Sequence, residues 1–101
     1  MKIAVHDRDR RGIFIHRDQL SGSPFIPGDR FALQKGQFEL FALTIIKEDN
    51  GDILFDKNGL FIARTRRVDM LLGGIFDEYR VEIAPKTPNS IRLRPLDIIA
   101  E

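Results

Sequence analysis

The feature of this chain that most constrains its fold is a similarity between its two halves. When Gly12 is placed on Gly59, the apolar and basic positions that follow also coincide. A chain of 101 residues has room for one domain, and neither half alone could bury its apolar face. We therefore predict a single domain, 1–101, in which internal repeats of about 1–47 and 48–101 interleave into one barrel. The first matched block pairs Phe14 with Phe61, Ile15 with Ile62 and Arg17 with Arg64.

The rest of the register needs insertions, which surface loops tolerate. Five more residues separate the third block from the second, and we place them in 34–37 against 82–90. The second block follows one inserted residue in the second half. It pairs Asp29 with Asp77, Phe31 with Tyr79 and Leu33 with Val81. The third block pairs Phe38 with Ile91, Leu40 with Leu93 and Ile45 with Ile98.

Strand patterns dominate both halves. Asn50-Gly51 and Asn58-Gly59 are dipeptides typical of type I′ turns, and they predict a hairpin over about 53–64. Alternation of apolar with polar residues predicts strands near 30–33 and 79–83, each buried on one face.

Two further strands follow from apolar content. Gln37 to Ile46 is apolar on both faces, which suits a central strand. Ile91 and Leu93 predict a final strand, which Pro95 should disrupt or push to an edge of the sheet.

Helical signals are short. Thr65 can cap a helix whose buried face carries Val68, Leu71 and Leu72, and Gly73-Gly74 supplies its stop. A weaker counterpart lies at 18–20. The sequence thus predicts a mainly β fold, a small barrel of two ββαββ-like repeats with short helices.

Composition removes several classes of function. The chain has no cysteine, which excludes disulfides and thiolate metal sites, and it has no long uncharged apolar run. The start turns charged after five residues, unlike a signal peptide, so we expect a cytoplasmic protein with no membrane contact. No nucleophile–base pair, Walker loop or dinucleotide fingerprint is present, so we expect no enzyme activity and no cofactor.

The order of signals in the first half resembles the AbrB/SpoVT/MraZ group of bacterial regulators. The second half fits less closely, because residues 74–77 replace the Pro-Gly-Asp turn, and His16 and Ala63 stand where the group usually has proline. The matching residues of the first half are Gly12, Ile13, Ile15, Arg17 to Leu20, Pro27-Gly28-Asp29, Phe31, Leu33, Phe38 and Leu40; those of the second are Gly59, Leu60 and Ile62.

This resemblance implies a swapped-hairpin barrel, normally made by two chains and here folded from one; a double-psi barrel uses a similar half-unit and is the alternative. It also implies DNA binding at promoters or antitoxin genes. Because a fold alone does not determine function, the expectation of DNA binding needs support from the residues of the site.

Eight basic residues are the candidate DNA-binding residues. Under the repeat register they form two symmetry-related clusters on one face, where arginine could grip phosphates or guanine edges. One alternative is an ordinary solvated surface neutralised by Asp7, Asp9 and Asp69. The others are a protein-interaction domain that binds a partner or a second copy of the chain without DNA, and a site for an anionic ligand. The residues are Arg8, Arg10, Arg11 and Arg17 in the first half and Lys57, Arg64, Arg66 and Arg67 in the second.

Other candidate sites have simpler explanations. His6 and Asp7 alternate to opposite faces of a strand and, with His16, lack a third spaced ligand, so we expect no metal. Gly22-Ser23 is similar to the self-cleavage site of pyruvoyl decarboxylases, but beside Pro24 a plain turn explains it. Five aromatic residues are interpreted as core, whereas the Phe25-Ile26 loop could be exposed for self-association. They are Phe25, Phe55, Phe61, Phe76 and Tyr79.

Overall fold

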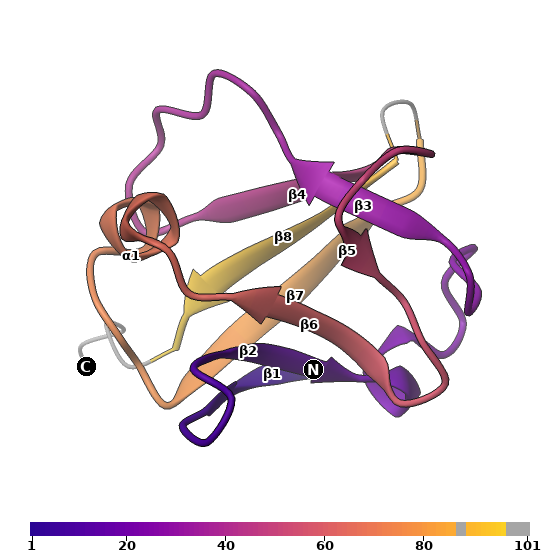
Figure 1. Ribbon diagram of the computed structural model, residues 1–101, viewed down its shortest axis with the longest axis horizontal. Helices are drawn as coiled ribbons and strands as arrows, with labels where there is room; N and C mark the ends of the chain where they lie inside the picture. Colours follow the sequence, from indigo (N-terminus) through magenta and orange to yellow (C-terminus); the bar gives the residue numbers. More distant parts are fainter. Residues whose placement is uncertain (87–88, 97–101) are drawn as a thin grey trace.

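The computed structural model describes residues 1–86 and 89–96, and within them eight strands form one antiparallel sheet (Figure 1). A 3-10 helix, η1 (Arg17–Leu20), follows the second strand, and an α-helix, α1 (Arg66–Leu72), follows the sixth. The mainly β barrel with short helices is thereby confirmed. The strands are β1 (Lys2–Asp7), β2 (Gly12–His16), β3 (Arg30–Leu33), β4 (Leu43–Lys47), β5 (Ile53–Leu54), β6 (Gly59–Ala63), β7 (Glu78–Ala84) and β8 (Ser90–Pro95).

The hairpins of the two halves alternate around the sheet. The strand order is β5-β3-β4-β8-β7-β1-β2-β6, and an isolated bridge between Phe55 and Leu60 joins the two outer strands into a nearly closed barrel. The first half supplies the hairpins β1–β2 and β3–β4, and the second supplies β5–β6 and β7–β8. The interleaving predicted from the repeat is therefore confirmed.

Exchange of the two halves maps the strand pairings onto one another. Phe14 lies opposite Phe61 in the β2–β6 pair, so the repeat equivalents face each other at a pseudo-twofold axis. The pairing of Ala4 with Tyr79 between β1 and β7 has its counterpart in Ile53 with Phe31 between β5 and β3. Gly12 and Gly59 open the equivalent strands β2 and β6.

The third block of the predicted register is wrong. Leu33 pairs with Ile45 just as its equivalent Val81 pairs with Leu93, so Ile45 corresponds to Leu93 and not to Ile98. Phe38 and Leu40, which the register had matched to strand residues, lie before β4. Ile98 itself lies outside the described residues. The five extra residues of the predicted register are absent, because 33–45 and 81–93 are equally long, and 82–84 belong to β7.

The central strand expected from Gln37 begins only at Leu43. The side-chain amide of Gln37 donates to the carbonyl of Thr44 and accepts from its backbone N, both at 2.9 Å, so a side chain satisfies the backbone where a strand partner would. Phe41 has a left-handed φ of 59°, which interrupts extended structure. Residues 34–42 therefore form a loop, called here the β3–β4 loop.

The hairpin near 53–64 is present as β5 and β6, but its turn is not type I′. Within the described residues, positive φ occurs at Gly59 and not at Asn58, Asn50 or Gly51. The carboxylate of Asp56 accepts from the backbone N of Asn58 at 2.7 Å and of Gly59 at 3.1 Å, and this side chain shapes the turn. The Asn58-Gly59 dipeptide therefore lies in a turn that the Asp56 carboxylate caps.

The helix and the final strand follow from local chemistry. Thr65 Oγ1 accepts from the backbone N of Val68 at 3.2 Å, and Gly73 ends α1 with φ 78°, as predicted. Pro95 does not push β8 to an edge, because β8 lies between β4 and β7. It is tolerated at the last position of the strand, since pairing with β4 has already ended at Leu93.

The barrel interior holds a continuous core. Phe31, Tyr79, Leu60 and Ile91 are almost completely buried. Of the aromatic residues interpreted as core, Phe25, Phe55 and Tyr79 are buried, whereas Phe61 and Phe76 are only half-buried. In the part of the chain that the structure describes, no helix has the length and apolar character to cross a membrane.

Candidate nucleic-acid interface

The antiparallel pairing of β2 with β6 decides where the predicted basic residues lie. The turn before β2 lies beside the C-terminal end of β6, where the backbone N of Arg64 donates to the carbonyl of Arg11 at 3.0 Å. At the opposite end of the pair, Arg17 donates from its backbone N to Asn58 and from its guanidinium to the carbonyl of Lys57. The first-half cluster is therefore split between the two ends.

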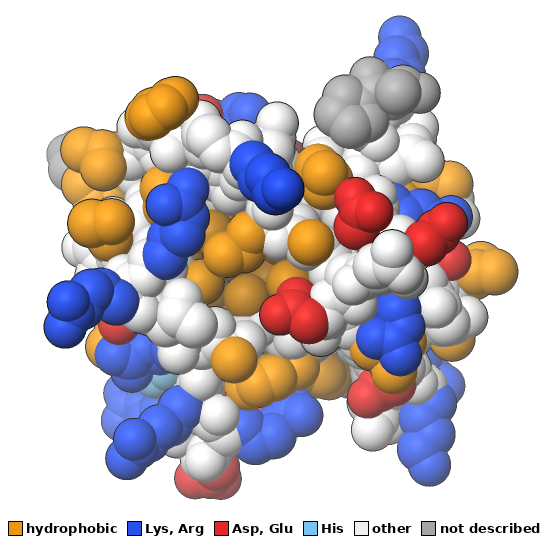
Figure 2. Space-filling model, turned by 45° about the horizontal axis from the view of Figure 1, so that its top comes forward, with side chains coloured by type: hydrophobic (Ala, Val, Ile, Leu, Met, Phe, Trp, Pro, Cys, Tyr) orange, Lys and Arg blue, Asp and Glu red, His pale blue; other side chains and the backbone are white. Residues whose placement is uncertain are grey.

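Six of the eight residues consequently gather at one end of the β2–β6 pair, and two at the other. The prediction of two clusters on one face is therefore wrong. The basic residues lie at the two pseudo-symmetric ends of the β2–β6 pair, and one end carries more positive charge than the other. Figure 2 shows several lysine and arginine side chains together at the lower left of that view. We call the larger group the basic end; it contains Arg8, Arg10, Arg11, Arg64, Arg66 and Arg67.

Half of the basic end is neutralised by carboxylates. Arg64 makes two hydrogen bonds to Asp69, at 3.1 and 2.9 Å, and the hydrogen bond to Asp69 raises the pKa of Arg64. Arg10 Nε lies 2.8 Å from Asp7, and the hydrogen bond from Arg10 lowers the pKa of that carboxyl. A looser pair joins Arg8 to Asp77 at 3.5 Å, with both side chains mostly exposed.

The other half carries uncompensated charge. Arg11, Arg66 and Arg67 are exposed, and none of them makes an ion pair with a residue in the described ranges. A surface hollow of about 260 Å³ lies between Arg11 and the start of α1. It is lined by Arg11, Arg64, Thr65, Arg66 and Asp69. Guanidinium groups around a hollow can hold phosphate oxygens.

The turn that carries three of these arginines is anchored on the barrel wall. The Arg10 guanidinium lies 4.9 Å from the ring centroid of Phe14 and 4.6 Å from that of Phe61, at the pseudo-twofold axis. Gly12 leaves room for the Phe61 ring, which a Cβ there would meet at 2.3 Å. Arg10 therefore has a structural role that the sequence analysis did not predict. The matched aromatic residues Phe14 and Phe61 are the signal that could have indicated it.

The remaining candidates behave as side chains of the fold. His16 Nδ1 accepts from the backbone N of Asp18 at 3.1 Å and caps η1. His6 Nε2 is buried without a hydrogen-bond partner among the described residues, where no group of metal-ligating side chains forms. Ser23 Oγ donates to the carbonyl of Leu20 and accepts from the N of Phe25, so Gly22-Ser23 is a turn. Phe25 is buried and Ile26 is 62% exposed.

An exposed apolar surface was missed by the sequence analysis. Phe38 is 90% exposed and Leu40 and Met70 are each 62% exposed. Figure 1 shows the β3–β4 loop running from β3 to the neighbourhood of α1, where the N of Phe41 donates to the carbonyl of Leu71 at 2.7 Å. We call this surface the apolar loop surface; it comprises Phe38, Leu40, Phe41, Met70 and Ile75.

The β3–β4 loop is held in place by a carboxylate between its exposed apolar residues. Glu39 lies 2.8 Å from Arg94 and 3.5 Å from Arg92, both on β8. The hydrogen bond from Arg94 lowers the pKa of Glu39, with the charges of Arg94 and Arg92 adding to the effect. These ion pairs connect the loop to β8 at the residue between Phe38 and Leu40.

Comparison with models of protein families, with curated proteins and with solved structures gives no match to this chain.

Proposed function

We propose that the protein is a small DNA-binding regulator that contacts the duplex backbone through its basic end. The observation that carries this proposal is the β2–β6 pairing, which brings residues 8–11 and 64–67 to one end, where Arg11, Arg64 and Arg66 line one hollow. Three arginines of this end are exposed and without a carboxylate partner in the described residues. Such groups give binding by charge, with release of counterions from the phosphates.

The proposal favours backbone contact over base readout. Arg64 and Arg10 are held by Asp69 and Asp7, so their guanidinium groups are oriented but partly neutralised. Arg11, Arg66 and Arg67 remain free to follow phosphate oxygens. Contacts of this kind position a protein on DNA without reading its sequence.

The salt dependence of binding tests this assignment. We expect the affinity for a short duplex to fall steeply between about 50 and 200 mM salt. Replacing Arg66→Ala and Arg67→Ala together should reduce the slope of log affinity against log salt by about two phosphate contacts. Fluorescence anisotropy with a labelled duplex measures both quantities.

The opposite end of the β2–β6 pair provides the matched control. Arg17→Ala with Lys57→Ala removes the same number of charges from the smaller cluster, so we expect it to leave the slope near that of the wild type. Equal losses in the two double variants would contradict a site at the basic end, and salt-independent binding would contradict phosphate contact altogether.

A second candidate function is protein interaction without DNA, and the apolar loop surface favours it. Clustered exposed apolar residues are typical of protein-interaction sites. Under this alternative, Phe38→Ser with Leu40→Ser should abolish self-association or partner binding in sedimentation experiments. The same variant should leave DNA affinity unchanged if the first proposal holds.

A further inference from the structure

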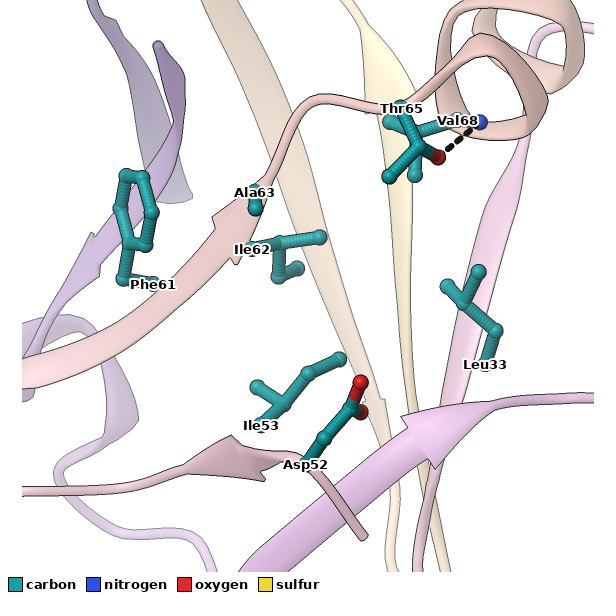
Figure 3. Close-up of a pocket in the computed structure, with 8 residues that line it drawn as sticks. All are labelled: Leu33, Asp52, Ile53, Phe61, Ile62, Ala63, Thr65 and Val68. Carbon is teal, nitrogen blue, oxygen red and sulfur yellow. Dashed lines mark hydrogen bonds between the residues drawn. The ribbon is translucent and has the colours of Figure 1, made fainter. Parts of the chain in front are cut away.

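The barrel is closed at one place by a single bridge, and a hollow opens beside it. Phe55 and Leu60 pair between β5 and β6, and no further β5–β6 bridge joins these strands toward Asp52 and Ala63 in the described chain. The space between them, about 210 Å³, is called here the seam hollow (Figure 3). It is lined by Leu33, Asp52, Ile53, Phe61, Ile62, Ala63, Thr65 and Val68.

The lining combines an apolar floor with one carboxylate. Figure 2 shows hydrophobic side chains at the bottom of the central depression and an acidic side chain at its rim. In Figure 3 the carboxylate of Asp52 points into the space between Ile53 and Leu33. Asp52 makes no ion pair with any residue in the described ranges, and it is the one ionisable residue of the lining.

The pseudo-twofold relation identifies the equivalent of Asp52 in the first half, where the contacts are different. The pairing of Ala4 with Tyr79 corresponds to that of Ile53 with Phe31, so the residue equivalent to Asp52 is Ile3. There the Gln19 amide reaches across from η1 and accepts from the backbone N of Ile3 at 2.8 Å. The second half has a carboxylate beside an apolar hollow where the first half has a hydrogen-bonded contact.

We propose that the seam hollow binds a small organic cation, an apolar group that carries a primary ammonium. The apolar part would lie on Ile53, Ile62 and Val68, and the ammonium would donate to Asp52. The volume is below the roughly 300–1,000 Å³ of sites for drug-sized ligands, so the ligand is small. A charge-assisted hydrogen bond at the mouth gives it orientation and selectivity.

This site adjoins the basic end, since Thr65 lines both hollows, but the charged side chain of its lining is a carboxylate. Lysine and arginine side chains surround the depression in Figure 2, but none belongs to the lining. An anion in the hollow would face the exposed Asp52 carboxylate, and repulsion between the like charges disfavours it there. A cation binds there, and phosphate binds at the other surface.

Titrations with three probes of one shape test the proposal on the full chain. The probes are 2-phenylethylamine, 2-phenylethanol and 3-phenylpropionate, followed by amide chemical shifts in ¹H–¹⁵N spectra. We expect the amine to bind at least about tenfold more tightly than the alcohol, the value of a charge-assisted hydrogen bond, and the carboxylate to bind most weakly. The shifted amides should lie at 52–53, 61–65 and 68.

Three variants complete the design. Asp52→Asn should bring the affinity for the amine down to that for the alcohol, whereas Asp49→Asn, another exposed aspartate outside the lining, should not. Ala63→Phe fills the mouth and should remove binding of both probes while the spectrum remains that of a folded protein. Unchanged amine affinity in Asp52→Asn, preference for the carboxylate, or shifts confined to other surfaces would overturn the proposal.

Discussion

Close backbone contacts decide which glycines this chain needs. A Cβ on Gly51 would lie 2.2 Å from the carbonyl oxygen of Phe31, although the φ of Gly51 is not positive. Gly36 presents the opposite case, with a φ of +73° and nothing within 4 Å of an added Cβ. The sequence predicts that both glycines lie in turns or loops. The structure shows that Gly51 is needed because a Cβ has no room there, and Gly36 because its φ is positive.

The two glycines should therefore respond differently to alanine. Gly51→Ala forces β3 away from the residues before β5, and we expect a loss of about 1–3 kcal/mol in the free energy of unfolding. Gly36→Ala keeps the space and strains only φ, for a loss of about 1 kcal/mol. Urea unfolding of both variants measures the difference, and a smaller loss at Gly51 than at Gly36 would contradict the packing described.

Residues that alternate regularly were placed correctly from the sequence. Phe31, Tyr79 and Leu93 are buried as their patterns indicate. Phe38 and Leu40 have the same apolar spacing but are exposed, because Glu39 between them is bound by Arg92 and Arg94 far along the chain. Local pattern cannot reveal a contact over that sequence separation.

The β3–β4 loop is joined to β8 by the ion pairs of Glu39 with Arg92 and Arg94. Its ion pairs lower the pKa of Glu39 below its ordinary value of 4.5, with the hydrogen bond from Arg94 as the largest cause. A carboxyl whose pKa is depressed on folding stabilises the protein above the unfolded pKa. That stabilisation is lost as the pH falls through the lower folded pKa.

Acidification below about pH 4.5 should therefore weaken the wild type more than Glu39→Gln, which has no carboxylate to protonate. Because Glu39 is half exposed, solvent screening keeps the effect small. Urea unfolding at pH 7 and pH 3 measures it, with Glu48→Gln as a control on an exposed glutamate. A Glu39→Gln variant that loses as much stability as the wild type would argue against a stabilising ion pair between Glu39 and Arg94.

At the scale of the whole molecule, the repeat in the sequence was the informative signal. It predicted the interleaved hairpins, because neither half alone could bury its apolar face, and in the structure the matched Phe14 and Phe61 meet across the two halves. The last third of the register failed, because Phe38 resembles Ile91 in polarity but lies in the β3–β4 loop, before the strand that corresponds to β8. The grouping of the arginines also could not be predicted, because it depends on β2 and β6 running antiparallel.

That pairing underlies the functional account, which places duplex binding at the end of the barrel formed by residues 8–11 and 64–67. The most direct measurement is a ¹H–¹⁵N titration of the full chain with a short DNA duplex at low salt. We expect the largest shifts at Arg11, Arg66 and Arg67 and at their neighbours, with little change at Arg17, Lys57 or the apolar loop surface. Shifts centred on those other surfaces, or none at all, would contradict the account.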